Sequence, residues 1–389
     1  QPVFAAGNDR ASWASLNPAG NGNDLLTSYN TSKNGVVVAA VSEVLNYTSA
    51  NSVNIASFSN FGPTDDFRIK PDISAKGVGV FSTTDSSTTS YGTLNGTSMA
   101  APGITGALLL LQQHYGNLNG GDYMLSSTLR GIMSHTASEA GPAEGPDHMY
   151  GWGLMNAEGA ANVISGKGTP NYILDERVLS QGGTYTINVY ATGTQPLEAT
   201  LAWTDRPGSA NNTITDSPTA RLVNNLDIRI TRNADTYLPW MLTNSLVNPV
   251  AIKGDNNADN IEKVKVDATA GVYTITVSHK GSLTGGSQEY SLIVSGINQS
   301  LLGNDAREIS MFSVWPNPAR DILNVSLNEI AGDDAYVTLY DANGRRVLEQ
   351  KLASNGENAV INVDTLSKGI YFVKVNLGEK QQVKKIVVN

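Results

Sequence analysis

The sequence predicts an α/β domain followed by two all-β domains, on three observations. Up to about residue 168, helix-like and strand-like segments alternate. From residue 169 the helical periodicity is gone, and short runs of alternating apolar and polar residues are separated by turn-forming pairs. A linker-like stretch then precedes a smaller region with the same alternation. We therefore expect domains at residues 1–168, 169–297 and 311–389, with a linker at 298–310.

In the first region, Val36–Val41 is a continuous apolar run of strand length, which is typical of a buried strand in a parallel sheet. Met99–Tyr115 has a helical pattern, with Pro102 expected in the first turn and Leu108–Leu111 expected to be buried. A further helix is expected at Ala157–Ser165. These elements predict an α/β domain, or part of one.

The second and third regions predict β-sandwiches. In the second, alternation predicts a sandwich or jelly roll that ends near Gly296, with strands at Thr184–Val189, Ala199–Trp203, Leu226–Ile230 and Tyr273–Val277. In the third, Asn343-Gly344 stands between two strand-like runs, Val337–Tyr340 and Arg345–Leu348. This pair is typical of a tight hairpin turn, so the third region is expected to be a small β-sandwich.

Composition excludes several classes of function. The 389 residues carry 26 Lys and Arg against 35 Asp and Glu, a net charge of −9. This balance argues against binding to nucleic acid or to an anionic membrane, because both need clustered positive charge. No apolar run approaches the ~18–20 residues that cross a bilayer, so no transmembrane segment is predicted. Cysteine is absent, which excludes disulfides and thiolate metal sites.

The motif that points most directly to chemistry is Asn95-Gly-Thr-Ser-Met-Ala-Ala-Pro102. Ser98 follows a Gly-Thr turn and lies at the start of an apolar helix, so its hydroxyl would be exposed. Free N–H groups and partial positive charge at a helix N-terminus favour a developing oxyanion. An isolated serine in this position would more often be a plain N-cap, so the motif needs support from elsewhere in the chain.

That support comes from three further segments, Ala5–Asn8, Ser57–Pro63 and Lys70–Ala75. Together with the Ser98 motif they resemble, in the same order, four motifs of the subtilisin-like serine peptidases, or subtilases. One such match alone would be weak, but four in order make a chance resemblance very improbable. The resemblance implies that residues 1–168 are the C-terminal part of a subtilisin-like catalytic domain with a parallel sheet.

The resemblance also implies roles for individual residues. Ser98 would attack the scissile carbonyl, and its backbone N–H together with the side-chain amide of Asn8 would hold the oxyanion. Ala5, Ala6 and Gly7 would line the pocket for the substrate residue before the cut. Their small side chains suit a roomy apolar pocket.

The general base is not apparent in this sequence. The family's chain order is Asp, His, Ser, yet the four histidines, His114, His135, His148 and His279, all follow Ser98. His114 is more than four helical turns from Ser98. His135 and His148 are expected to be structural or surface residues, with a structural role favoured for His148. We therefore expect the catalytic Asp and His to lie before Gln1, and this N-terminally truncated chain to be inactive or nearly so by itself.

The second region resembles the jelly-roll domain that follows the catalytic domain in some alkaline subtilases, through Leu201–Asp205, Leu222–Asp227 and Asn260–Val264. The resemblance implies that it braces the catalytic domain or touches substrate. No cofactor is required for the chemistry. The oxygen-rich segment Asp255–Asn260 would suit structural calcium, but it lacks the Gly and Glu of an EF-hand loop, so a solvated polar loop is the favoured interpretation. The metal ligands stay undetermined.

The third region resembles the C-terminal sorting domain of type IX secretion, through Ser313–Leu323, Gly369–Phe372 and the basic end Lys384–Asn389. Trp315 stands where the family pattern has Tyr. The resemblance implies a small Ig-like β-sandwich that engages the type IX secretion machinery. It places the protein outside a Gram-negative cell, secreted or at the cell surface.

Two hypotheses follow for the function. The first is a secreted serine endopeptidase that hydrolyses protein or peptide substrates through an acyl-enzyme on Ser98. The second is a non-catalytic surface pseudo-peptidase or binding protein in which Ser98 is a relic. Asn8 weighs against the second, because a relic has no physical need for an oxyanion donor.

Overall fold

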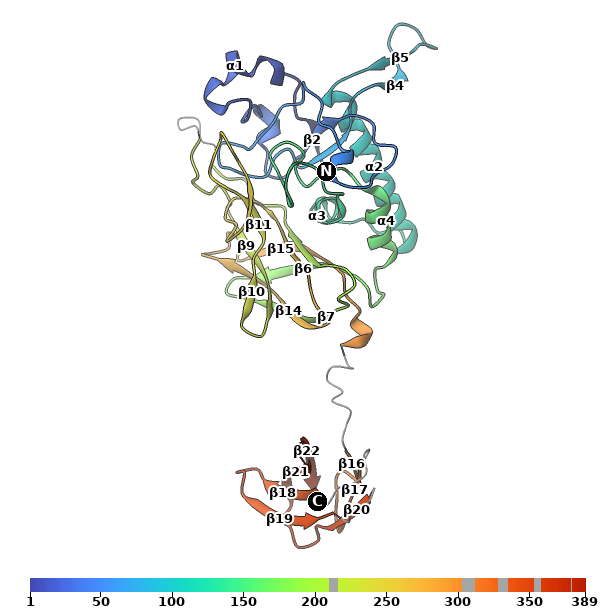
Figure 1. Cartoon of the computed structure of the whole chain (residues 1–389), viewed down its shortest axis with the longest axis vertical. Helices are drawn as coiled ribbons and strands as arrows, with labels where there is room; N and C mark the ends of the chain where they lie inside the picture. Colours follow the sequence, from blue (N-terminus) through green and yellow to red (C-terminus); the bar gives the residue numbers. More distant parts are fainter. Residues whose placement is uncertain (210–215, 303–311, 328–334, 353–357, 379) are drawn as a thin grey trace. The chain divides into compact units, whose positions relative to one another are not determined.

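The computed structural model describes residues 1–209, 216–302, 312–327, 335–352, 358–378 and 380–389. It divides into two compact units, residues 1–302 and 303–389. Unit 1 contains an α/β part and a β-sandwich part, and unit 2 is a smaller β-sandwich (Figure 1). The expected regions 1–168 and 169–297 thus lie in one compact body. Most of the expected linker 298–310 lies outside the described residues.

The α/β part is built on a three-stranded parallel sheet in the order β1 (Val3–Ala5), β2 (Val36–Val41), β3 (Ile73–Lys76). Every residue of β2 is buried, which confirms the prediction from its continuous apolar run. The remaining elements of this part are α1 (Trp13–Leu16), the hairpin β4 (Val80–Thr83) and β5 (Tyr91–Leu94), and the helices α2 (Thr97–Leu118), α3 (Ser126–Thr136) and α4 (Ala157–Ser165).

Helix α2 packs one face on the sheet, where Ile104 and Leu108 share a core with Val36 and Ile73. Two expectations about this helix were wrong. It begins at Thr97, so Pro102 lies inside the helix rather than in its first turn. The burial expected for Leu108–Leu111 holds only for Leu108 and Leu111, whereas Leu109 and Leu110 are both 66% exposed. A helix of 3.6 residues per turn cannot direct four consecutive leucines to one face.

The β-sandwich part of unit 1 has two antiparallel four-stranded sheets, ordered β10-β9-β14-β7 and β13-β8-β15-β6. Their inner faces enclose one apolar core that includes Trp203, Ile228 and Leu292. The four strands predicted here are confirmed as β7, β8, β9 and β14, although Thr184 and Trp203 lie one residue outside β7 and β8. The bounds are β6 (Ile173–Ser180), β7 (Tyr185–Ala191), β8 (Leu197–Ala202), β9 (Asn225–Arg232), β10 (Asp235–Tyr237), β13 (Ile261–Val266), β14 (Gly271–Lys280) and β15 (Ser287–Ser295), with a separate pair β11 (Trp240–Leu242) and β12 (Ala251–Lys253).

The two parts of unit 1 are joined through α3, which packs on β8 and β15. Gly131 allows this close approach, because a Cβ there would lie 2.6 Å from Cδ1 of Ile293. Beside this contact, Lys33 Nζ donates to Asp205 Oδ2 at 2.5 Å in a buried ion pair. Asn34 also binds the backbone of Asp205, donating to its O at 2.8 Å and accepting from its N–H at 3.0 Å.

Unit 2 has a three-stranded sheet, β16-β17-β20, and a four-stranded sheet, β19-β18-β21-β22, around a shared apolar core. The predicted hairpin is confirmed: β18 and β19 pair antiparallel, and Gly344 has a positive φ of 76° at the turn. The strand bounds are β16 (Phe312–Trp315), β17 (Ile322–Leu327), β18 (Ala335–Asp341), β19 (Arg346–Lys351), β20 (Asn358–Asn362), β21 (Gly369–Leu377) and β22 (Lys380–Val388).

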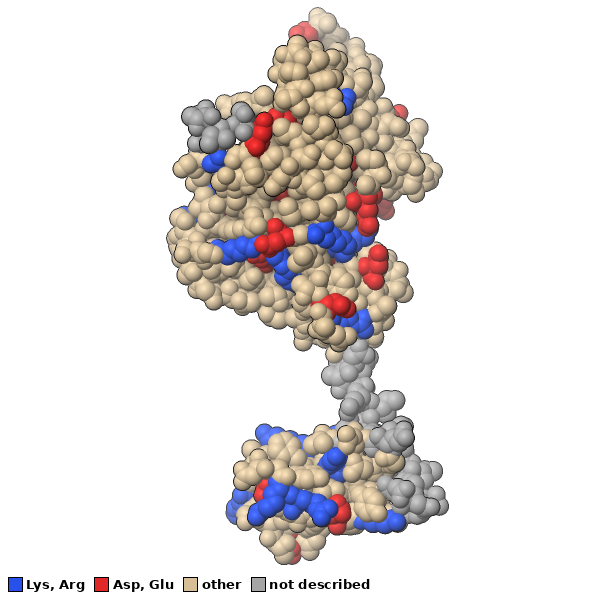
Figure 2. Space-filling view, turned by 60° about the vertical axis from the view of Figure 1, so that its left-hand side comes forward, with Lys and Arg blue, Asp and Glu red and all other residues tan. Residues whose placement is uncertain are grey.

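No helix among the described residues is both long and apolar enough to cross a membrane. The face of unit 1 seen in Figure 2 is largely uncharged, with acidic and basic side chains in small mixed patches. This agrees with a sequence in which only 16% of residues are charged.

Candidate active site

Asn8 stands in a turn shortly after β1, and one residue of the Ser57–Pro63 motif, Asn60, holds that turn through its backbone and its side chain. Asn60 N–H donates to Gly7 O at 3.0 Å, and Asn60 Oδ1 accepts from Asp9 N–H at 2.7 Å. Gly7 has a φ of +107°, and a Cβ there would lie 2.3 Å from Asn60 Nδ2. Only glycine at position 7 permits this close contact with Asn60, which determines the position of Asn8 after the strand.

The turn that carries Ser98 is fixed from the opposite side. Gly96 N–H donates to Gly77 O at 2.8 Å, and Asn95 Oδ1 accepts from Gly79 N–H at 2.6 Å. Gly96 has a φ of +151°, a conformation that other residues rarely adopt. Ser98 is the second residue of α2 and is exposed.

The two turns meet through Thr97, which is fully buried. Asn8 Oδ1 accepts from Thr97 N–H at 2.8 Å and from Thr97 Oγ1 at 3.0 Å. Thr97 Oγ1 in turn accepts from Gly7 N–H at 3.1 Å. Because the amide oxygen of Asn8 is held by two donors, its nitrogen Nδ2 is left as the free end of the side chain.

Two N–H donors face one small space beside Ser98. A Cβ built on Gly96 would lie 3.6 Å from Asn8 Nδ2 and 3.6 Å from the backbone N of Ser98. Glycine at position 96 keeps that space empty. The Ser98 N–H has no acceptor within the helix, because the first four N–H groups of a helix lack one. An exposed hydroxyl beside two preorganised donors can bind a tetrahedral oxyanion of acyl transfer.

Comparison with known proteins agrees with this geometry. Residues 2–153 match the model of the subtilase family. This segment belongs to the subtilase family. Residues 313–389 match the model of a secretion system C-terminal sorting domain, which marks the chain as a secreted or cell-surface protein of a Gram-negative bacterium.

Individual relatives match a limited part of the chain. Subtilisin DY from Bacillus licheniformis is 39% identical over 108 residues, which cover 28% of this chain and 33% of that protein. Bacillopeptidase F from Bacillus subtilis is 34% identical over 122 residues, 30% of this chain and 8% of that protein. Among solved structures, the patellamide maturation protease PatA aligns with a TM-score of 0.32 and 22% identity, over 42% of this chain and 51% of that one. The chain thus spans a third or less of the length of these two curated relatives.

The three residues expected to line the substrate pocket lie at the end of β1 and directly after it. Ala5 and Gly7 are half-buried. Ala6 differs from the expectation for a pocket-lining side chain, because it is fully buried and packs with Leu26 and Val37. Residues alternate between the two faces of an extended segment, and Ala5 accordingly packs against the other core, the one that the sheet shares with α2.

None of the four histidines contacts Ser98 in the described structure. His135 is buried between Thr200 Oγ1 and Ser295 Oγ, each at 2.9 Å, and His148 lies edge-on to Phe61. Burial lowers the pKa of both rings to about 4, so they stay neutral at pH 7. His114 binds Ser165 and His279 binds Gly182. The structural interpretation of His135 and His148 is therefore confirmed.

The Lys70–Ala75 motif ties the subtilase sheet together. Asp72 Oδ2 accepts from Lys70 Nζ at 2.5 Å and from Val37 N–H at 2.7 Å, and Lys70 also donates to Gly35 O at 2.7 Å. Burial lowers the pKa of Lys70, with the Asp72 carboxylate opposing the shift. This motif is part of the scaffold, whereas Thr97 and Asn60 position the site. Sequence reasoning missed those two roles, although both residues stand inside recognised motifs.

The Asp255–Asn260 loop is not the solvated loop that was expected. Asn256 is fully buried, and Asp259 and Asn260 are only 6% and 5% exposed. The Asp259 carboxylate accepts from Ile69 N–H and from Asn256 Nδ2, both at 2.9 Å. Its oxygens therefore serve protein donors that link the β-sandwich part to the subtilase segment. Burial raises the pKa of Asp259 to about 6.

An acidic cluster that the sequence did not reveal lies elsewhere on unit 1. Ligand oxygens of Asp24, Asp65 and Asp216 lie within 4.8 Å of one another, a spacing that a metal ion could bridge. Burial, together with the charges of Asp65 and Asp216, raises the pKa of Asp24 to about 7.

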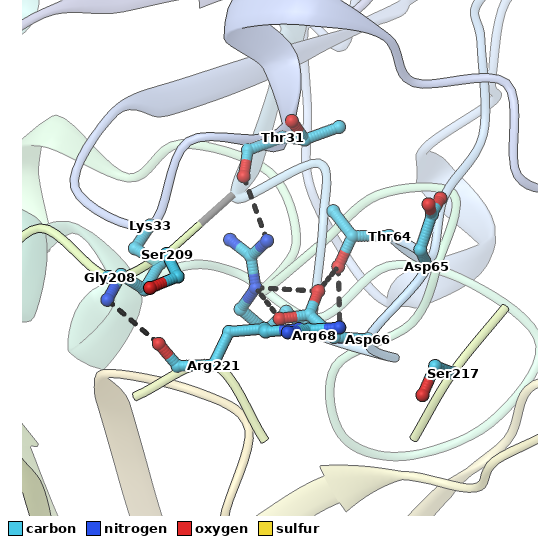
Figure 3. Close-up of a pocket in the computed structure, with 10 residues that line it drawn as sticks. All are labelled: Thr31, Lys33, Thr64, Asp65, Asp66, Arg68, Gly208, Ser209, Ser217 and Arg221. Atoms are coloured by element: carbon cyan, nitrogen blue, oxygen red, sulfur yellow. Dashed lines mark hydrogen bonds and ion pairs between the residues drawn. The ribbon is translucent and has the colours of Figure 1, made fainter. Parts of the chain in front are cut away.

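Beside this cluster is a cavity of about 380 Å³. In its wall, Arg68 Nε donates to both oxygens of Asp66 at 2.9 Å and Nη2 donates to Thr31 O at 2.8 Å (Figure 3). None of the residues that line this cavity belongs to the Ser98 site.

Proposed function

We propose that this chain is the C-terminal part of a secreted serine endopeptidase that hydrolyses peptide bonds in protein or peptide substrates through an acyl-enzyme on Ser98. One observation carries the proposal: Asn8 Nδ2 and Ser98 N both lie 3.6 Å from a single point in the space that Gly96 keeps open. Two nitrogen donors close to one point beside an exposed serine hydroxyl match what acyl transfer requires.

In this reaction Ser98 Oγ attacks the carbonyl carbon of the scissile bond and gives its proton to a general base. The carbonyl oxygen becomes an oxyanion held by Asn8 Nδ2 and Ser98 N–H. Collapse of the tetrahedral intermediate releases the amine half and leaves the acyl-enzyme, which water then hydrolyses. We propose that the Asp and His of the triad lie on polypeptide outside this sequence, so this chain should bind tetrahedral adducts without turnover.

The β regions would support that activity. Numbering the eight main strands of the sandwich from β6 to β15 gives sheets 6-3-8-1 and 5-4-7-2, an arrangement that supports the jelly-roll interpretation. Its tie to the subtilase segment at Asp205 favours a bracing role. For unit 2 we propose an Ig-like sandwich that engages the type IX secretion machinery.

The test has two arms. The native secreted protein is treated with a fluorophosphonate probe and the adduct is mapped by peptide mass spectrometry. We expect the label on Ser98, together with peptides from an upstream segment that contains His. The 389-residue chain is titrated with a peptide boronic acid, which forms a tetrahedral adduct on a serine oxygen without a general base.

We expect the boronic acid to bind the chain and to lose binding in Ser98→Ala. Folded native protein that takes no label, with nothing upstream, would overturn the peptidase. It would favour the non-catalytic binding protein instead. This alternative is favoured by one observation: among the described residues, no histidine contacts Ser98.

A further inference from the structure

The hairpin of β4 and β5 carries an aromatic surface to which the proposed function gives no role. Phe81 and Tyr91 stack with ring centroids 5.6 Å apart and an interplanar angle of 17°. Phe81 is nevertheless 69% exposed and Tyr91 62%. The hairpin stands out from the body of unit 1 (Figure 1). Among the described residues, therefore, most of both rings is left uncovered.

Strand register places the two rings on one face. Phe81 pairs with Thr93, and Tyr91 pairs with Thr83. Because side chains alternate along a strand, these four residues point to the same side of the hairpin. All four are exposed. We call them the hairpin face. Residues 80–94 include one charged side chain, Asp85, so the hairpin is suited to apolar rather than ionic partners.

The hairpin leads directly to the nucleophile. β5 ends at Leu94, and Asn95-Gly96 connects it to the helix that carries Ser98. Among the described residues β5 pairs only with β4, so its second edge has backbone groups free to pair with an extended peptide.

The Ser98 turn lies between the segment after β1 and the hairpin. On one side Thr97 N–H binds Asn8, and on the other Gly79 N–H binds Asn95. In the proposed reaction the half of the substrate before the cut lies along Ala5–Gly7. The half after the cut must then leave the Ser98 turn on the other side, where the hairpin stands.

We propose that the hairpin face binds apolar side chains of the substrate segment that follows the scissile bond. This inference rests on the proposed function and names its substrate class: extended, uncharged segments with aromatic or large aliphatic residues after the cut. An open stacked pair offers ring surface to a further ring. If the pair served only to hold the hairpin together, it would not distinguish one peptide from another.

The test measures binding to the 389-residue chain by fluorescence anisotropy. Two labelled peptides share the same alanine-rich half before the cut and differ in the half after it, which has either two phenylalanines or two serines. We expect the phenylalanine peptide to bind about fivefold or more tightly than the serine peptide. The double variant F81S/Y91S should bind both peptides equally, at the affinity of the serine peptide.

Two matched variants control for the loss of ring surface. F81Y/Y91F keeps both rings and should keep the preference. Tyr123→Ser removes a ring that is 76% exposed in the loop after α2, away from the hairpin, and should also keep it. Circular dichroism spectra confirm that each variant is folded. A phenylalanine preference that survives F81S/Y91S overturns the inference, as does equal binding of both peptides by the unmodified chain.

The boronic acid titration separates this inference from the proposed function, because that ligand has no segment after the cut. If a boronate adduct forms on Ser98 but the phenylalanine preference is unaffected by F81S/Y91S, the proposed peptidase function is supported and the proposed role of the hairpin face is overturned. A preference that F81S/Y91S abolishes, without any boronate adduct, keeps the hairpin face as a peptide-binding surface and overturns the peptidase.

Discussion

The Ser98 turn and the Asp205 junction are both built from short polar contacts between distant segments, but they use those contacts differently. At Asp205 the carboxylate accepts from Lys33, Val223 N–H and Asn224 N–H, and the backbone N–H and O are both bound by Asn34. At the Ser98 turn the Asn8 oxygen is fully engaged, whereas Asn8 Nδ2 and Ser98 N–H are kept free.

The difference shows that the same kind of polar contact can serve stability in one place and reactivity in another. Saturated polar groups hold parts together, because a buried group that loses its partner is costly. Donors that are oriented but unused can hold charge that appears only during a reaction. At these two places, therefore, satisfied polar groups belong to the scaffold and unused donors belong to the candidate site.

Breaking the saturated junction should have the largest effect. Asp205→Ala leaves the N–H groups of Val223 and Asn224 without their acceptor and removes the buried carboxylate that pairs with Lys33. We expect a loss of about 3–5 kcal/mol in the free energy of unfolding. Urea denaturation measures it. Asp175→Ala is the control, since the Asp175–Arg177 pair is more than a third exposed. Equal effects of the two substitutions would contradict the saturated-junction interpretation.

Removing the free donor should change reactivity. Asn8→Ala in the complete enzyme should lower kcat by about 10²–10³-fold, the size known for loss of the oxyanion amide in a subtilisin. In this chain the same change should weaken the peptide boronic acid. Asn8→Asp keeps the accepting oxygen and removes the Nδ2 donor, so it should weaken the ligand equally. Undiminished affinity in Asn8→Asp would mean that Nδ2 is not a donor to the adduct.

Acid should destabilise unit 1 through its buried histidine. The pKa of His135 is lowered to about 4 by burial, whereas the unfolded chain has the ordinary value near 6.5. The unfolded state therefore takes up the proton first, and the contribution of His135 to stability is lost as pH falls from 6.5 toward 4. The loss approaches about 1 kcal/mol per pH unit. His135→Gln should flatten this part of the urea stability profile between pH 7 and 5, while His114→Gln should leave it unchanged.

The smallest effect is expected at Thr97, a buried residue whose hydroxyl holds Asn8 in position. Thr97→Val removes the hydroxyl that binds both Asn8 Oδ1 and Gly7 N–H, so the free donor is less well positioned. We expect about a tenfold loss of affinity for the peptide boronic acid, equivalent to about 1.4 kcal/mol. Thr97→Ser keeps the hydroxyl and should restore most of the affinity. If serine and valine behave alike, the hydroxyl does not position Asn8.

Elements governed by local patterns could be predicted from the sequence. The apolar run Val36–Val41 coincides with β2, and the helix Ala157–Ser165 coincides with α4. The Ser98 motif predicted a serine at a helix start, and the structure has Ser98 in the first turn of α2. In each case residues close together in the chain determine the outcome.

What could not be predicted depends on partners far away in the chain. Asn8 and Thr97 are 89 positions apart, and only their packing shows that the amide oxygen is engaged and the nitrogen free. The burial of Asp259 depends on Ile69, 190 positions earlier. Composition could describe that loop as polar, but not which donors it would meet.

The Asp205 junction has a consequence for how this protein can be divided. A boundary at residue 168, natural by sequence pattern, would separate Lys33 and Asn34 from their partners and expose the face of α3 that packs on β8 and β15. Residues 1–302 should instead melt as a single cooperative transition in calorimetry. Anyone who wishes to express the subtilase segment, or to transplant it into another protein, has to carry the sandwich along with it.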